Sequence, residues 1–273
     1  MNAALRPALW GVLNVTPDSF SDGGAYLEPR AALDHAHQMV AEGASVIDVG
    51  GESTRPGANR SSATEEQSRI MPLVESLVAE GITVSVDTMR ASTAALALEA
   101  GAQIINDVSG GLADAQMFPV IAGARCDYVL MHWRGHSDTM DSLAHYDDVV
   151  RDVGSELLER TTMAISAGIE ASRIVVDPGL GFAKTPEHNW ALLRDLSALV
   201  KPGQRMVVGA SRKRFLGALL PPGHRPTERD ALSATLGALL ADQGVWALRV
   251  HNVAAHREAL DIWQAVSHGG FDA

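Results

Sequence analysis

Two aspartates and an asparagine each end a short apolar run in this chain, namely Asp87, Asn106 and Asp177. If the runs are neighbouring parallel strands, their carboxyl ends lie on one face and bring the three side chains together. A carboxylate can accept two N–H groups in parallel, so these groups would match a flat heterocycle that presents several N–H donors. The alternative is that each side chain caps the helix that follows its strand, a common role of Asp and Asn.

A second set of side chains suits an anion. Lys213 lies in the basic run Gly209-Ala-Ser-Arg-Lys-Arg-Phe-Leu-Gly, which lacks the spacing of a P-loop. Arg249 and His251 alternate along another apolar run, so both point to the same side of a strand. Near Asn14, at the end of the first run, they could hold a diphosphate, because arginine donates from a planar fork and an amide or phosphate oxygen suits Mg²⁺.

Two other reactive side chains have a simpler interpretation. His132 ends an apolar run, but no partner stands at a metal-ligand spacing, and we interpret it as structural. Cys126 is the single cysteine of the chain, which fits a reducing compartment, and its place at the edge of an apolar run favours plain packing. The chain contains no zinc pattern, nucleophile elbow or dinucleotide fingerprint.

Eight strand-like runs alternate with eight helical patterns along the chain. The predicted strands are 9–14, 45–49, 82–87, 103–107, 127–132, 173–177, 205–210 and 246–251. The predicted helices are 30–42, 64–80, 91–100, 114–123, 147–167, 187–199, 228–243 and 253–266. Short runs rich in β-branched residues are typical of buried parallel strands.

This alternation predicts an α/β protein, either a (β/α)8 TIM barrel or a doubly wound open sheet. The number eight favours the barrel, and so do polar residues at the end of every strand, since an open sheet needs them only near its switch point. Those residues are Asn14, Asp48, Asp87, Asn106, His132, Asp177, Ser211 and His251. We predict one barrel domain over residues 1–267 and a frayed tail over 268–273.

Composition narrows the class of protein further. With 273 residues, 46% apolar and 20% charged, the chain can bury a large core. The net charge of −11 argues against broad binding of nucleic acid or of an anionic membrane. No apolar run approaches the ~18 residues that cross a bilayer, and the start of the chain lacks the pattern of a secretory signal, so we expect a cytoplasmic protein.

Seven stretches, in order along nearly the whole chain, resemble the dihydropteroate synthases of folate synthesis. They are Val12-Leu-Asn-Val-Thr-Pro-Asp-Ser-Phe-Ser-Asp-Gly-Gly, Asp48-Val-Gly-Gly-Glu-Ser-Thr-Arg-Pro-Gly, Ser85-Val-Asp-Thr, Asn106-Asp-Val-Ser-Gly, Asp177-Pro-Gly-Leu-Gly-Phe-Ala-Lys, Gly209-Ala-Ser-Arg-Lys-Arg-Phe-Leu-Gly and Arg249-Val-His. The resemblance implies a (β/α)8 barrel, commonly a homodimer, whose small-molecule substrates are (7,8-dihydropterin-6-yl)methyl diphosphate and 4-aminobenzoate. The products would be 7,8-dihydropteroate and diphosphate, with Mg²⁺ as cofactor and sulfonamides as mimics of aminobenzoate.

The resemblance also implies roles for individual residues. The pterin would be bound by Asp87, Asn106, Asp177 and Lys213. The diphosphate would be bound by Asn14, Thr54, Arg249 and His251, with Mg²⁺ on Asn14. Aminobenzoate would contact Thr54, Arg55, Pro56, Phe182, Ser211 and Lys213. Catalysis would rest on Asp22, Arg55 and Lys213, and a first loop with Asp18, Phe20 and Asp22 would close over the diphosphate.

Two positions depart from the family pattern. Asn252 stands where aspartate is usual, and the lost charge could alter the orientation of His251. Trp133 stands where methionine is more frequent and could change the pocket beside the pterin. The alternatives to the synthase are a pterin-dependent methyltransferase, which uses a related barrel, and a pterin-binding paralogue that has lost catalysis.

Overall fold

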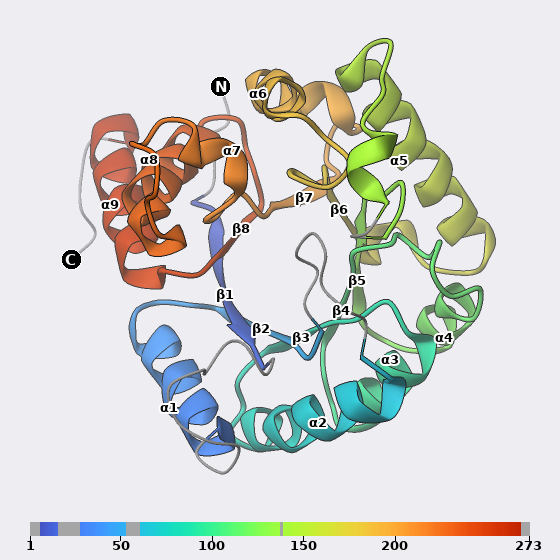
Figure 1. Ribbon diagram of the computed structural model, residues 1–273. Coiled ribbons are helices and arrows are strands. Elements are labelled where there is room, and N and C mark those ends of the chain that lie inside the picture. Colours follow the sequence, from blue (N-terminus) through green and yellow to red (C-terminus); the bar gives the residue numbers. More distant parts are fainter. Residues whose placement is uncertain (1–5, 16–27, 53–60, 137–138, 269–273) are drawn as a thin grey trace.

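Eight parallel strands form a ring at the centre of the molecule (Figure 1). The computed structural model describes residues 6–15, 28–52, 61–136 and 139–268. The strands are β1 (Ala8–Asn14), β2 (Val46–Gly50), β3 (Val84–Asp87), β4 (Ile104–Asp107), β5 (Asp127–Met131), β6 (Ile174–Asp177), β7 (Arg205–Val208) and β8 (Ala247–Val250). Each pairs with the next along the chain, and β8 pairs with β1. The predicted TIM barrel is therefore confirmed, and the open sheet is excluded.

Helices surround the ring (Figure 1). They are α1 (Glu28–Ala41), α2 (Ala63–Ala79), α3 (Ala91–Glu99), α4 (Met117–Gly123), α5 (Val149–Ser166), α6 (Pro186–Arg194), α7 (Arg214–Gly217), α8 (Asp230–Ala241) and α9 (Val253–His268). The 3-10 helices are Met140–Leu143, Ala171–Arg173, Leu196–Leu199 and Pro226–Arg229. Among the described residues, no helix has both the length and the apolar character that crossing a bilayer requires.

Two helical segments differ from the prediction. The helix expected over 187–199 ends at Arg194, because Asp195 adopts a non-helical backbone and its carboxylate accepts the N–H of Ala198, 3.2 Å away, to start a 3-10 turn. The short helix α7 follows β7 in a segment where the sequence predicted none. The last helix continues to His268, the first residue of the predicted tail, while 269–273 lie outside the described residues.

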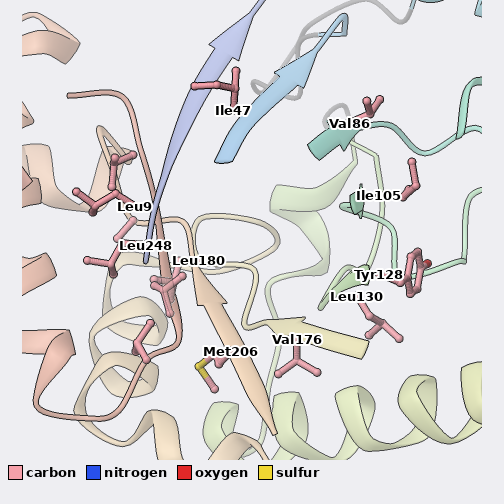
Figure 2. Close-up of a cluster of buried hydrophobic side chains, with 14 of the residues drawn as sticks. Leu9, Ile47, Val86, Ile105, Tyr128, Leu130, Val176, Leu180, Met206 and Leu248 are labelled. Atoms are coloured by element: carbon pink, nitrogen blue, oxygen red, sulfur yellow. The ribbon is translucent and has the colours of Figure 1, made fainter. Parts of the chain in front are cut away.

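Alternation along the strands separates two apolar layers. Ile47, Ile105 and Leu248 belong to the main core, several of whose side chains are drawn in Figure 2. Strand residues of the opposite parity fill the inside of the barrel in a separate cluster. That cluster consists of Trp10, Val46, Ile104, Val129, Val175, Val207 and Ala247. Trp10 is fully buried and meets Trp246 edge to face, with ring centroids 5.6 Å apart.

The polar residues lie one layer above this apolar plug. Asp48, Asn106, Asp177 and Arg249 each stand two residues beyond a member of the interior cluster on the same strand. Because side chains alternate with a period of two, all four point into the barrel at the carboxyl ends of the strands. The fold thus closes the bottom of the barrel with apolar side chains and leaves polar ones at the top.

Asp107, the last residue of β4, organises the turn that follows it. Its carboxylate accepts the N–H groups of Ser109 and Gly111 at 2.8 and 2.7 Å and the hydroxyls of Ser109 and Tyr128 at 2.6 and 2.7 Å. Tyr128 and Asp107 are both fully buried, so water cannot replace a lost hydrogen bond.

We therefore expect Tyr128→Phe to lower the free energy of unfolding by about 1–3 kcal/mol, because the buried Asp107 carboxylate loses one of its four hydrogen bonds. Urea unfolding followed by circular dichroism measures the change. The slope with denaturant should stay the same, because the substitution leaves the buried surface almost unchanged. An unchanged midpoint would contradict the prediction.

Candidate active site

A cavity of about 780 Å³ opens at the carboxyl ends of the strands. Asn14 lines it from the end of β1, Asp87 from β3, and Arg249 from β8. Further lining comes from the segments after β6, β7 and β8, through Phe182, Ser211, Lys213 and His251. The acidic and cationic residues predicted to share one site are therefore brought together.

Asp177 belongs to the same site. A Cβ on Gly209, which lines the cavity, would lie 3.7 Å from the Asp177 Oδ2 atom and 3.9 Å from the Arg249 Cβ atom. The other oxygen, Oδ1, accepts the N–H of Gly179 at 2.7 Å. One carboxylate oxygen thus fixes the following loop, while the other faces the region between β7 and β8.

Arg249 connects three strands inside the barrel. Its Nε atom donates to Asp48 on β2, and its Nη2 atom donates to Asp87 on β3 at 2.6 Å. Asn106 on β4 donates from Nδ2 to Asp48 at 3.3 Å. A guanidinium has five N–H donors, so these two contacts leave donors for a ligand. Asp48, fully buried, was noted in the sequence only as a strand end, and its contacts with Arg249 and Asn106 were not foreseen.

Burial and neighbouring charges shift the pKa values at this site. Burial raises the pKa of Asp87 to about 7, against the opposing effect of Arg249. It also raises the pKa of Asp177, although the Gly179 N–H and Lys213 favour the carboxylate. Burial lowers the pKa of Lys213 to about 8, with Asp177 opposing. Burial opposes the charge of Arg249 too, but Asp48 and Asp87 hold its pKa above the usual value.

His251 is neutral in this environment. Burial, together with Arg212 and Arg249, lowers its pKa to about 3. Its Nδ1 atom lies 3.1 Å from the Ser211 Oγ atom, which also accepts the His251 backbone N–H at 3.2 Å. The serine hydroxyl has one O–H to donate, and we assign it to Nδ1, which puts the ring proton on Nε2. His251 can therefore offer an anion a neutral hydrogen bond but no positive charge.

The two departures from the family pattern have local explanations. Asn252 donates to Asp230 at 3.2 Å and accepts the N–H of Ala255 at 3.0 Å, at the start of α9. The His251 ring is held by Ser211 rather than by Asn252. Trp133 packs on the apolar cluster of Met89, Val108 and Met131, against which Phe182 also packs.

His132 lies outside the barrel interior and contacts side chains of the surrounding elements. Val129 points into the barrel, so His132, three residues later, faces the surrounding helices. Its Nε2 atom lies 2.9 Å from Glu156 on α5, and its Nδ1 atom lies 2.8 Å from the Lys184 Nζ atom. Lys184 belongs to the Asp177-Pro-Gly-Leu-Gly-Phe-Ala-Lys stretch, but its residue type and spacing alone indicated no role. Cys126 is buried and unpaired, as the packing interpretation expects.

Part of the predicted site lies outside the described residues. These positions are Asp18, Phe20, Asp22, Thr54, Arg55 and Pro56. Within the described ranges, no group of three or more His, Cys, Asp or Glu side chains could hold a metal ion. Asn14 offers an amide oxygen at the cavity wall, a donor set that fits Mg²⁺, which keeps several of its waters, better than zinc.

Comparison with known proteins shows the family of the chain. The model of the pterin binding enzyme family matches residues 10–251. Dihydropteroate synthase of Mycobacterium leprae is 52% identical over 265 residues, which cover 95% of this chain and 93% of that protein.

Solved structures give the same result. Xanthomonas albilineans dihydropteroate synthase with 4-aminobenzoic acid superposes with a TM-score of 0.89 at 42% identity, covering 96% of this chain and 94% of the other. Burkholderia cenocepacia dihydropteroate synthase complexed with 7,8-dihydropteroate has a TM-score of 0.87 at 37% identity, covering 97% and 92%. The fold and site define a pterin-binding barrel enzyme. Within the pterin binding enzyme family, the chain belongs to the dihydropteroate synthases, which are transferases.

The Arg249 network leads to a stability prediction. Replacing one partner of a buried ion pair leaves the other charge uncompensated, so Asp48→Asn should lower the free energy of unfolding by about 3 kcal/mol. Asp127→Asn is the matched control, because Asp127 binds Arg205 through two contacts of 2.7 Å but is 28% exposed. Asp127→Asn should lower the free energy of unfolding by no more than about 1 kcal/mol. Chemical denaturation measures the free energy of unfolding of both variants. Equal decreases would contradict the prediction, because they would show that burial of the ion pair does not decide the effect.

Proposed function

We propose that this barrel joins (7,8-dihydropterin-6-yl)methyl diphosphate to 4-aminobenzoate, releasing 7,8-dihydropteroate and diphosphate. The observation that carries the proposal is the meeting of Asp87, Asp177 and Lys213 with Arg249 and His251 around one cavity. Its volume of about 780 Å³ is within the range of small-molecule sites. Membership of the family supplies the identity of the reaction.

The pterin ring is assigned to the inner part of the cavity. Asp87 and Asn106 are register partners on β3 and β4, and the free Oδ2 atom of Asp177 lies across the barrel on β6. These oxygens suit the N–H groups of a pterin, which a carboxylate can accept in pairs. Lys213 completes the proposed pterin set with a donor for the acceptor atoms of the ring.

The diphosphate is assigned to Asn14 on β1, Arg249 on the adjacent strand β8 and His251 just after β8, with Thr54 from the second loop. Arg249 retains donors beyond those bound to the acids, and His251 offers its Nε2–H. Mg²⁺, which we propose as cofactor on Asn14, would neutralise part of the negative charge of the leaving group.

Aminobenzoate is assigned to the outer part of the cavity. Phe182 and Lys213 lie next to one another, with the Lys213 Nζ atom 4.2 Å from the ring centroid. The aromatic face and the ammonium group suit an aromatic carboxylate, and Ser211 lines the same wall. Thr54, Arg55 and Pro56 complete this set in the proposal.

We propose a dissociative reaction. The methylene carbon–oxygen bond breaks, diphosphate leaves with the electron pair, and the aniline nitrogen attacks the resulting cation and then loses a proton. Asp87 and Asp177 stabilise the positive charge that develops on the pterin, while Arg249 stabilises the negative charge of diphosphate. Asp22, Arg55 and Lys213 are the proposed catalytic residues, and no covalent enzyme nucleophile is needed.

We also propose a homodimer in the cytoplasm, built as one domain over residues 1–267. Exposed apolar side chains on α8 and α9 support a subunit contact, since Leu239, Ile262 and Val266 are 61%, 66% and 80% exposed. The unpaired Cys126 fits a reducing compartment.

The direct test of the reaction is incubation of the purified protein with both substrates and Mg²⁺. We expect release of diphosphate that depends on aminobenzoate and is inhibited competitively by a sulfonamide. A folded protein that binds the pterin but releases no diphosphate would support the silent paralogue. Methyl transfer from methyltetrahydrofolate would support the methyltransferase.

The pterin assignment predicts the effect of Asp177→Asn. The substitution removes the charge that accepts the ring N–H groups, so it should weaken binding of a pterin without diphosphate about tenfold or more. Calorimetry at neutral pH measures the affinity. Asp141→Asn is the control, because Asp141 lines the outer part of the same cavity and should leave the affinity unchanged. Equal affinity of wild type and Asp177→Asn would refute the assignment.

A further inference from the structure

Lys184 is a buried lysine at the wall of the cavity, with three acceptors around its ammonium group. Lys184 directly follows the loop of residues 179–183 after β6, and it is 8% exposed. The Nζ atom lies 2.8 Å from the His132 Nδ1 atom, 3.1 Å from the Gly179 carbonyl oxygen and 3.0 Å from the Phe182 carbonyl oxygen. An ammonium has three N–H donors, so its charged form matches these three acceptors one to one.

The neighbours of Lys184 fix where the protons are. Burial lowers the pKa of His132 to about 4, so its ring is neutral. Burial opposes the charge of Glu156, but hydrogen bonds from His132 and Arg134 lower its pKa to about 2. Glu156 therefore accepts the His132 Nε2–H at 2.9 Å, which leaves Nδ1 as the acceptor that Lys184 requires. Glu156, on α5, thus selects the tautomer of His132 in which Nδ1 accepts a hydrogen bond from Lys184.

The loop that Lys184 holds comprises residues 179–183, and several of its other backbone groups are also bound. Asp177 accepts the N–H of Gly179, and Asn189 accepts that of Gly181 at 2.7 Å. The Tyr146 hydroxyl donates to the Ala183 carbonyl at 3.0 Å. Ala183 has a φ of +47°, a conformation that is costly for alanine and persists only where the surroundings impose it.

This loop carries Phe182 into the cavity. Lys184 binds the backbone carbonyl of Phe182, while the ring of Phe182 contacts Lys213. Gly179 fixes the loop from the other end, since a Cβ there would lie 2.2 Å from the His132 carbonyl oxygen. The backbone contacts of Phe182 and Gly179 therefore help to set the height and tilt of the Phe182 ring in the cavity.

We propose that Lys184, in its charged form, is a positioning residue that fixes the 179–183 loop and thereby sets the affinity of the site for the aromatic amine that packs on Phe182. Glu156 and His132 act with it by presenting the ring nitrogen that the ammonium binds. The inference rests on the proposed function for the identity of that amine, 4-aminobenzoate.

The charge of Lys184 also gives the inference a pH signature. Burial lowers its pKa to about 7, with Asp177 and Glu156 opposing this and Arg134 and Lys213 adding to it. The other titratable groups near the ammonium are His132, which is neutral above pH 4, and His188, whose pKa burial also lowers. A neutral amine has two N–H donors, so one of the three acceptors loses its partner as pH rises through about 7. The KM for aminobenzoate should rise over that range.

The test compares Lys184→Met, Glu156→Gln and Glu159→Gln with wild type in steady-state kinetics from pH 6 to 8. Lys184→Met should raise the KM for aminobenzoate about tenfold at pH 6, where wild-type Lys184 is charged, and the ratio to wild type should shrink toward pH 8. The KM for the pterin diphosphate should stay within about twofold. Glu156→Gln should change the KM for aminobenzoate in the same direction, and Glu159→Gln, an exposed position on the same helix, should have no effect.

Amide hydrogen exchange provides a second readout that does not need catalysis. Exchange at Gly181 and Phe182 should be faster in Lys184→Met and Glu156→Gln but not in Glu159→Gln. If Lys184→Met does not fold, Glu156→Gln is used for the test. The Glu156 side chain is 36% exposed, so its substitution should leave the protein folded. Equal increases in both KM values, or a pH-independent ratio with unchanged exchange, would overturn the inference. An inactive wild type with the expected exchange would reject the proposed function alone.

Discussion

The contact of Arg249 with Asp48 and Asp87 is the interaction on which the site depends. Bringing an arginine inside a barrel removes it from water, at a cost of several kcal/mol unless partners compensate. Two carboxylates from two other strands provide that compensation, and the apolar plug beneath them excludes water from below. The arginine in turn keeps Asp48 and Asp87 close together, which their mutual repulsion would otherwise oppose. Each charge is tolerable in the interior because the others are there.

The sequence predicted the barrel and much of the site because both follow from local patterns. The alternation of β-branched runs with amphipathic segments located all eight strands, and the polar residue at each strand end located the face that carries the site. The alternation of side chains along a strand predicted the shared direction of Arg249 and His251, and the same signal is present in other strands. Applied to β2 and β8, it would have pointed both Asp48 and Arg249 into the barrel, and applied to β5 it would have turned His132 outward.

Other features of the site could not be read from the sequence, because they depend on contacts between distant segments. The neutral state of His251 follows from its burial and from Arg212 and Arg249, which only the closed barrel brings near. Lys184 gains its role from Glu156, 28 residues earlier, through His132. The end of α6 at Arg194 depends on the Asp195 side chain, which starts a 3-10 turn. The short helix α7 has only four residues, too few for helical periodicity to show.

The depth at which each charge is held gives the cavity a direction. Asp87 and Asp177 lie on the strands themselves, whereas the cations Lys213, Arg214 and Arg229, which line the cavity, follow the strands. The exposed Asp141 also lines the cavity, but a single carboxylate is outnumbered there by these cations. A ligand rich in N–H donors is therefore favoured at the inner end, and anionic groups are favoured toward the outer part. Arg249 is the exception, since it donates to the acids from the inner layer and still has donors for a phosphate. A molecule with a donor-rich ring and a charged tail can satisfy this gradient in one orientation only, because the reversed one would place its phosphates against the buried carboxylates.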